Sequence, residues 1–141
     1  MKLSVVLPCY NEEENIARIS EILIPELQKL GCEYEILLID DGSTDRSFEV
    51  ARALIVPELR IIRHEKNGGL GAAVKTGIRN ATGDLLVTLD SDFTFHPRYI
   101  KDLLARFAKG DVDFVIGSPR LASFGKDIQK YRVLISIAAN M

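Results

Sequence analysis

Two aspartates follow an apolar run in the segment LLVTLDSD, residues 85–92. Asp90 and Asp92 are separated by one residue, so in a turn both carboxylates can approach one hard cation, directly or through water. Magnesium takes oxygen ligands and commonly bridges to substrate phosphates, so the pair suits a clamp for a metal–diphosphate group. Such a metal would neutralise charge on a departing phosphate. Aspartates that merely cap a solvated turn are the alternative, and the position of the pair in the fold decides between them.

A second acidic pair, Asp40 and Asp41, follows the apolar run YEILLI at residues 34–39. Adjacent carboxylates are costly unless each finds a partner. One of them could accept hydrogen bonds from the base or ribose of a ligand, while the other caps or pairs within the fold. A plain turn before a helix, with Ser43 or Thr44 as the cap, is the alternative.

The segment Pro8-Cys9-Tyr10-Asn11-Glu12 ends the first apolar run of the chain. Tyr10 could pack on a planar base, and Glu12 could accept a hydrogen bond from a ribose hydroxyl. Alternatively, Tyr10 lies at the edge of the core, and Glu12 lies in a first helical turn, where the helix dipole favours its negative charge. We expect Cys9 to be a buried packing residue rather than a nucleophile.

The glycine-rich segment NGGLGAAVKTG, residues 67–77, matches neither common phosphate-binding motif. A P-loop has glycine directly before Lys-Thr, where Val74 stands here, and a dinucleotide fingerprint follows the first strand rather than the third. We interpret the segment as a tight turn and a helix start. Lys75 is expected at the surface, and a reach into the site is the alternative. Four later cations suit the outer oxygens of a diphosphate, or else form a solvated helix face: Arg120, Lys126, Lys130 and Arg132.

Alternating apolar runs and helical patterns must position these groups. We expect strands at 3–8, 34–39, 59–63, 84–89 and 113–117, and helices at 11–30, 43–54, 70–81 and 97–108. Asn11 is expected to cap the first helix, Pro25 to kink or split it, and His96 to cap or pack. The alternation predicts an α/β fold, with a Rossmann-like, mostly parallel sheet and helices on both faces. Ligands of such sheets bind beyond the carboxyl ends of the strands, where the polar clusters stand.

Length and composition fit a single domain, residues 1–141, with 47% hydrophobic residues. The net charge of −2 gives no overall basic field for nucleic acid or anionic lipid. Two cysteines and two histidines do not suggest zinc or a disulfide framework, so a reducing, cytoplasmic setting is expected. The beginning of the chain is unlike a signal peptide, and no run approaches the roughly 18 apolar residues of a membrane span. The apolar segment 131–141 has no polar fringe, and we expect the chain to be the first part of a longer catalytic domain.

The motifs P-C-Y-N-E, D-D-G-S, N-G-G-L-G-A-A-V-K-T-G and D-S-D, in this order, resemble those of family 2 glycosyltransferases, the inverting enzymes of the GT-A fold. The segments F-T-F-H-P, F-V-I-G-S and R-V-L-I-S-I-A-A-N are most similar to dolichyl- or polyprenyl-phosphate sugar transferases, especially the mannosyl type. Relatives often have glutamine at the position of Thr94, and often read G-S-R where this chain has Gly117-Ser118-Pro119-Arg120.

The resemblance implies a donor that is a GDP- or UDP-sugar, an acceptor that is a lipid phosphate, and no nucleic-acid partner. Magnesium or manganese would be held by Asp90 and Asp92. Asp92 and Arg132 would be catalytic, with Thr94 and Arg120 as further phosphate contacts. The nucleotide would be held by Pro8, Tyr10, Glu12, Asp41 and Ser91. The full-length protein would act at the cytoplasmic face of a membrane.

Two other functions fit the same residues. A family 2 transferase could use a growing polysaccharide as its acceptor, and its Q-x-x-R-W motif would lie beyond residue 141. A non-catalytic nucleotide-binding or receiver-like signalling module is a more distant alternative. Receiver domains carry their acidic pair after the first strand and a lysine after the fifth, whereas Asp40 and Asp41 follow the second predicted strand.

Overall fold

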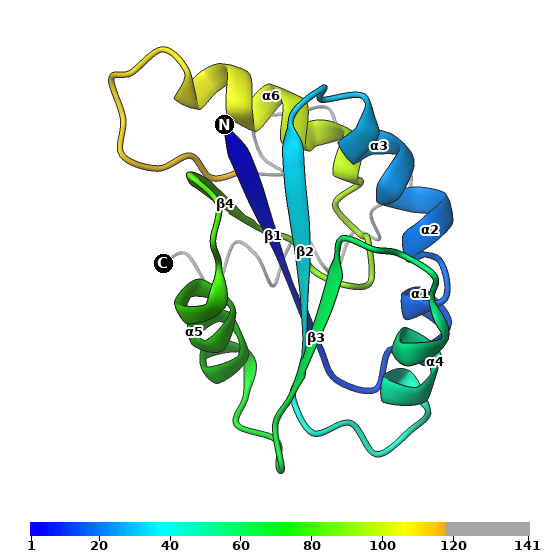
Figure 1. The fold of residues 1–141 in the computed structure, drawn as a ribbon. Coiled ribbons are helices and arrows are strands. Elements are labelled where there is room, and N and C mark those ends of the chain that lie inside the picture. The colour runs from blue at the N-terminus through cyan, green and yellow to red at the C-terminus, as the bar shows by residue number, and fades with distance from the viewer. Residues whose placement is uncertain (118–141) are drawn as a thin grey trace, which may run out of the picture. The chain divides into compact units, whose positions relative to one another are not determined.

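The computed structural model describes residues 1–117 of the chain. Within them, four strands form one parallel sheet in the order β3-β2-β1-β4 (Figure 1). The strands are β1 (Lys2–Cys9), β2 (Glu33–Asp40), β3 (Leu59–Arg63) and β4 (Leu85–Thr88). Parallel neighbours require crossover connections, and helices supply them here. The predicted α/β class and parallel sheet are therefore confirmed.

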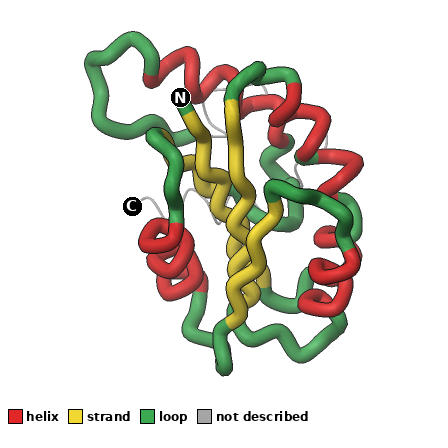
Figure 2. The backbone as a smooth tube through the Cα atoms, viewed as in Figure 1, coloured by secondary structure: helices red, strands yellow, loops and turns green. Residues whose placement is uncertain are grey.

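The two central strands are buried along nearly their whole length. Val5, Val6 and Leu7 of β1, and residues 36–39 of β2, have no exposed surface. Successive strand residues point to opposite faces, so continuous burial requires cover on both sides of the sheet. Figure 2 shows helices flanking the strands on both sides, as the sequence predicted.

Helix α5 (Leu70–Asn80) covers one face of the sheet. Val6, Leu37, Ile39 and Ala73 form a buried cluster between this helix and the strands. Gly77 is also buried, and a Cβ atom there would overlap the methyl groups of Val6. The missing side chain therefore lets α5 lie close against β1.

The helices before β3 are short. Residues 11–30, predicted as a helix that is kinked or split at Pro25, are divided twice: beside Pro25, as predicted, and at residues 17–18, which was not predicted. The structure has α1 (Glu13–Ile16), α2 (Ile19–Ile22) and α3 (Ile24–Gln28) in this region, followed by α4 (Ser47–Ala53) after β2. At the breaks, the N–H groups of Arg18 and Glu26 donate to carbonyls only three residues back, which tightens the turns. Pro25 lies in the first turn of α3, where a missing N–H is tolerated. The predicted apolar face survives as four buried residues: Ile16, Ile19, Leu23 and Leu27.

A second compact unit begins at Lys101. The predicted helix over 97–108 is observed as the 3-10 turn η1 (Pro97–Tyr99) followed by α6 (Ile100–Phe107). His96 caps η1 as expected, because its Nδ1 accepts a hydrogen bond from Arg98 N at 3.1 Å. The predicted strand over 113–117 was wrong, since no ladder of hydrogen bonds pairs these residues with another described strand. Apolar composition alone does not make a strand without a partner.

Candidate functional site

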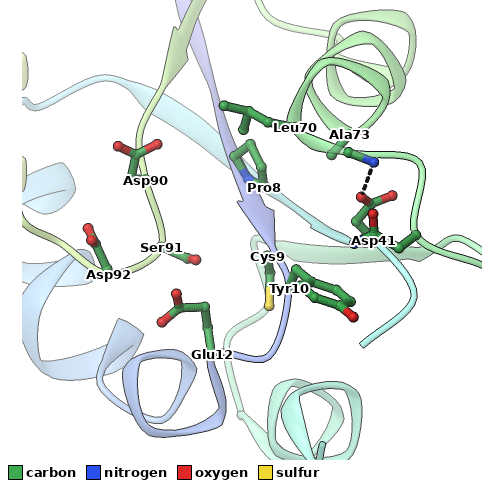
Figure 3. A pocket seen from close by; sticks show the side chains of 12 residues that line it. Pro8, Cys9, Tyr10, Glu12, Asp41, Leu70, Ala73, Asp90, Ser91 and Asp92 are labelled. Atoms are coloured by element: carbon green, nitrogen blue, oxygen red, sulfur yellow. Dashed lines mark hydrogen bonds between the residues drawn. The ribbon is translucent and has the colours of Figure 1, made fainter. Parts of the chain in front are cut away.

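Four loops at the carboxyl edge of the sheet line a pocket of about 310 Å³ (Figure 3). They follow β1, β2, β3 and β4, and the start of α5 adds Leu70 and Ala73 to the wall. The three polar clusters that were expected at this edge, after β1, β2 and β4, all contribute to its wall. The lining residues are Pro8, Cys9, Tyr10, Glu12, Asp41, Asn67, Gly69, Leu70, Ala73, Asp90, Ser91 and Asp92.

The acidic loop after β4 is a tight turn. The N–H of Leu89 donates to the carbonyl of Val6 at 3.0 Å and extends the pairing of β4 with β1. The N–H of Phe93 then donates back to the carbonyl of Asp90 at 3.1 Å. Phe93 has a φ of 51°, which is unfavourable for a residue with a large side chain. This strained turn holds Asp90, Ser91 and Asp92 at the pocket (Figure 3).

Negative charge accumulates at this side of the pocket. Partial burial, the charge of Asp92 and the charge of Glu12 together raise the pKa of the Asp90 carboxyl. Within residues 1–117, no lysine or arginine forms an ion pair with Asp90. Asp92 accepts hydrogen bonds from Thr94, from the backbone N to Oδ1 and from Oγ1 to Oδ2, both at 2.8 Å. A cation at this position would relieve the repulsion between the carboxylates.

The loop after β1 is fastened to the loop after β2. Asn11 Oδ1 accepts from the N–H groups of Thr44 and Asp45, at 2.8 and 3.3 Å. Asn11 N in turn donates to Ser43 Oγ at 3.0 Å. Asn11 therefore does not cap the first helix, and that prediction was wrong because its side chain satisfies a neighbouring loop instead. Its φ of 55° is a conformation that asparagine tolerates better than most residues.

The N-terminus of α4 is also held differently from the prediction. Neither Ser43 nor Thr44 caps it, because the helix begins only at Ser47. The N–H of Ser47 donates to Asp45 Oδ1 at 2.9 Å, and Ser47 Oγ accepts from the N–H of Glu12 at 2.8 Å. The two loops thus share a network that fixes the backbone beside the pocket.

Tyr10 and Glu12 both face the pocket from the loop after β1 (Figure 3). Tyr10 keeps 45% of its residue surface exposed, so its ring is available for stacking. Glu12 stands before α1 and accepts a hydrogen bond from Asn15 Nδ2 at 2.7 Å. Cys9 is buried as expected, and burial raises the pKa of its thiol to about 11. It is therefore protonated and unreactive at neutral pH.

The two aspartates that follow β2, Asp40 and Asp41, have different roles. Asp40 Oδ1 accepts from the N–H of Ser43 at 2.9 Å, and its Oδ2 lies 3.1 Å from Arg63 Nε. Asp40 therefore makes its contacts within the fold, as was expected for one member of the pair. Asp41 lines the pocket, although only 3% of its surface is exposed.

Asp41 also organises the loop before α5. Its Oδ1 accepts from His64 Nδ1 at 2.6 Å and from the N–H of Gly68 at 3.0 Å, and its Oδ2 accepts from the N–H of Gly69 at 2.7 Å. Burial alone would raise the pKa of this carboxyl, but the hydrogen bonds from Gly68, His64 and Gly69 outweigh it and lower the pKa. Asp41 is therefore ionised at neutral pH.

Sequence reasoning missed Gly42 and His64. Gly42 has a φ of 72°, and a Cβ atom there would lie 2.7 Å from Asn67 N, so only glycine lets the two loops touch. The turn pattern Asp-Gly was a visible signal for Gly42. His64 is a lone histidine after a strand, and nothing in the sequence connects it with Asp41.

Two further residues from the sequence analysis, Lys75 and Thr94, are described by the structure but do not line the pocket. Lys75 is exposed on α5, as expected. Thr94 contacts Asp92 rather than lining the pocket. Arg120 and Arg132 lie outside the described residues. No helix among residues 1–117 is long and apolar enough to cross a membrane.

Comparison with known proteins explains this arrangement. Residues 4–136 match the family described as Glycosyl transferase family 2. The chain belongs to this family. A dolichol-phosphate mannosyltransferase of Pyrococcus furiosus is 39% identical over 144 residues, covering 100% of this chain and 40% of that relative. An undecaprenyl-phosphate 4-deoxy-4-formamido-L-arabinose transferase of Photorhabdus laumondii is 38% identical over 112 residues, covering 77% of this chain and 34% of that relative.

Solved structures show the same GT-A architecture for this family 2 chain. The glucosyl-3-phosphoglycerate synthase of M. tuberculosis aligns with a TM-score of 0.63 and 29% identity, over 78% of this chain and 42% of that one. S. aureus TarS in complex with UDP-GlcNAc aligns with a TM-score of 0.60 and 27% identity, over 77% and 32%. The chain thus spans about two fifths or less of the length of these proteins.

Proposed function

We propose that this chain forms the donor-binding part of a metal-dependent, inverting glycosyltransferase. The enzyme would move a sugar, mannose or glucose, from a nucleotide diphosphate to a polyprenyl or dolichyl phosphate. The observation that carries the proposal is the convergence of three predicted motifs on one pocket, with Glu12, Asp41 and Asp90 in its wall. Family membership and relatives named for polyprenyl-phosphate carriers support the reaction class.

The nucleotide would occupy the side of the pocket formed by the loops after β1 and β2. The exposed ring of Tyr10 offers a stacking surface for the base, beside Pro8. The carboxylates of Glu12 and Asp41 are acceptors for hydroxyl or N–H groups of the ribose and base. Ser91 stands between the nucleotide and the metal-binding side, and its hydroxyl can serve either. S. aureus TarS, whose complex contains UDP-GlcNAc, supports a sugar-nucleotide ligand.

The residues Asp90 and Asp92 fit a divalent cation. They supply hard carboxylate oxygens, and partial burial together with the charges of Asp92 and Glu12 raises the pKa of Asp90. No group of three or more potential ligand side chains occurs in residues 1–117, so phosphate oxygens and water would complete the coordination. Bound there, Mg²⁺ or Mn²⁺ would neutralise charge on the nucleotide diphosphate as it departs.

The acceptor phosphate needs little activation by the protein. Its oxygen is already an anion, so attack on the anomeric carbon does not require a strong general base. Attack from the face opposite the nucleotide inverts the configuration. Asp92 and Arg132 are the proposed catalytic residues, with Thr94 and Arg120 as further phosphate contacts. A lipid acceptor requires a membrane surface, and we propose that the full-length protein acts at its cytoplasmic face.

Isothermal titration with GDP and UDP, each with and without Mn²⁺, tests the donor side. We expect one nucleotide to bind, and to bind at least about tenfold more tightly with the metal, which corresponds to about 1.4 kcal/mol. Asp90→Asn should remove the metal dependence without unfolding the chain. Asp102→Asn, in the exposed first turn of α6, changes the same charge at a residue that is not among those lining the pocket, and should leave binding unchanged.

The outcomes of this titration are distinct. Binding that is equally tight without metal, or unaffected in Asp90→Asn, would contradict the metal site but retain a nucleotide pocket. Failure of both nucleotides to bind a folded wild-type chain would overturn the donor assignment. Transfer of labelled sugar from the preferred donor to polyprenyl phosphate then tests the acceptor.

A different acceptor is the second candidate. One structural neighbour is named a glucosyl-3-phosphoglycerate synthase, so proteins of similar fold are not all named for lipid carriers. A soluble product in the same assay, with no label in the lipid phase, would favour this alternative.

A further inference from the structure

His64 connects the end of β3 to two of the segments around the pocket. Its N–H donates to the carbonyl of Asp40 at 2.8 Å, which fixes its backbone beside β2. Its ring Nδ1 lies 2.6 Å from Asp41 Oδ1, and its Nε2 lies 2.9 Å from Thr76 Oγ1 on α5. The ring is thus held at both nitrogens, and it stands behind Asp41 rather than in the pocket wall.

The two oxygens of Asp41 are used unequally. Oδ1 accepts from both His64 Nδ1 and Gly68 N, whereas Oδ2 accepts from Gly69 N alone. A carboxylate oxygen can accept about two hydrogen bonds, so Oδ2 retains capacity that Oδ1 has used. Asp41 lines the pocket, as Figure 3 shows beside Leu70 and Ala73. Oδ2 is therefore the oxygen of Asp41 that has capacity for one further donor.

We propose that His64 is a positioning residue for the nucleotide, because it engages Oδ1 of Asp41 and so presents Oδ2 to an N–H or O–H donor of the base or ribose. The inference rests on the proposed function of the pocket. Without the ring, the Asp41 carboxylate can rotate about its last bond, and the two glycine N–H groups can exchange oxygens. The acceptor would then be poorly ordered before the ligand arrives, which weakens binding.

The contacts from Asp41 through His64 to Thr76 do not depend on whether the His64 ring is charged. Asp41 is ionised and can only accept, so His64 Nδ1 carries a hydrogen. In the neutral ring Nε2 accepts from the hydroxyl of Thr76, and in the charged ring Nε2 donates to it. Thr76 therefore holds the ring in one orientation in either state.

Nucleotide titration of His64→Ala and His64→Asn, together with thermal unfolding of both, tests the proposal. The asparagine amide can replace Nδ1–H as the donor to Asp41, whereas alanine cannot. We expect His64→Ala to weaken binding of the preferred nucleotide by about tenfold, comparable with the loss of one hydrogen bond to a charged group. His64→Asn should bind within about threefold of wild type. His96→Ala removes the other histidine, which lies outside the pocket wall, and serves as the control.

Recovery of nucleotide affinity in His64→Asn, compared with His64→Ala, distinguishes a positioning role of His64 from a purely structural one. The inference is overturned if His64→Asn and His64→Ala bind the nucleotide equally well. It is also overturned if the loss of affinity in each variant merely follows the fall in its melting temperature. If the folded wild-type chain binds neither nucleotide, the proposed function fails and this inference fails with it. Wild-type binding that His64→Ala leaves unchanged overturns the inference alone.

Discussion

Asp90 illustrates a residue that is placed for binding rather than for stability. Its carboxyl is partly buried, lies near Asp92 and Glu12, and has a raised pKa. A carboxyl with a raised pKa in the folded state binds more protons there than in the unfolded state. The free energy of unfolding therefore falls as the pH rises through this window, just above the ordinary pKa of aspartate. A bound cation would remove the repulsion that causes this loss of stability.

We predict that Asp90→Asn makes the metal-free chain slightly more stable at pH 7, by less than about 1 kcal/mol for a partly solvated site. Urea unfolding at pH 7 and pH 4 measures this, and the advantage should shrink at pH 4, where the wild-type carboxyl is more protonated. Asp102→Asn should show no such gain. A clear loss of stability in Asp90→Asn would contradict the repulsion inferred around this residue.

The contacts of single residues show where sequence reasoning stops. The pocket positions of Asp90 and Asp41 could be predicted, because the carboxyl ends of parallel strands meet at one edge. The partners of Asn11 and His64 could not, because they come from segments 12 to 34 residues away. Those contacts depend on how the loops pack, which periodicity does not encode.

Among the elements, the strands are joined at their amino ends by the buried carboxylate of Glu35 on β2. Its Oε1 accepts from Ser4 Oγ and Thr82 N, both at 2.6 Å, and its Oε2 accepts from Arg60 at 3.0 Å. Burial would raise the pKa of this carboxyl, but these hydrogen bonds outweigh it and lower the pKa from 4.5 to about 2. A single side chain thus connects β1, β2 and β3 with the loop before β4.

We predict that Glu35→Gln lowers the free energy of unfolding at pH 7 by about 2 to 3 kcal/mol. Because the pKa is lowered by folding, the stabilisation is complete above pH 4.5 and is lost as the pH falls toward 2. The difference between variant and wild type should narrow over that range in urea unfolding. Glu33→Gln, exposed on the same strand, is the matched control, and a pH-independent difference would contradict the assignment.

The contact between α5 and β1 gives a second prediction at this scale. Gly77→Ala should destabilise the chain by about 1 to 3 kcal/mol, because the new methyl group overlaps Val6. Gly71→Ala, on the same helix, adds a methyl group in open space and should be neutral or stabilising by less than about 1 kcal/mol. Chemical denaturation measures both. Equal effects at the two positions would show that helix propensity, not packing, decides.

The arrangement of elements was predictable where apolar runs, turns and length agreed, as for β1, β2 and α5. The prediction failed where a local sequence pattern was not supported by contacts with other elements. Residues 113–117 have the composition of a strand but no partner strand in the described part of the chain. The segment 11–30 has a helical period, but its backbone tightens at two points, where N–H groups donate to carbonyls three residues back.

For the whole molecule, ligand binding should appear as added stability. A nucleotide at 100 times its dissociation constant stabilises the folded state by about 2.7 kcal/mol. We predict that GDP or UDP with Mn²⁺ raises the melting temperature by several degrees, that EDTA reverses most of the rise, and that Asp90→Asn abolishes the metal-dependent part. A rise that persists unchanged in EDTA would contradict the metal's role in holding the diphosphate.

The strand order also governs how the chain reaches this structure during synthesis. β1 is made first, yet it lies inside the sheet, where Leu3 pairs with Tyr34 on one side and with Leu85 on the other. One edge of a largely apolar strand therefore stays unpaired on the ribosome until β4 has emerged. Long-range parallel pairing of this kind is slow and exposes the nascent chain to aggregation. Translation speed through residues 41–84 should consequently influence how much of the protein is recovered folded.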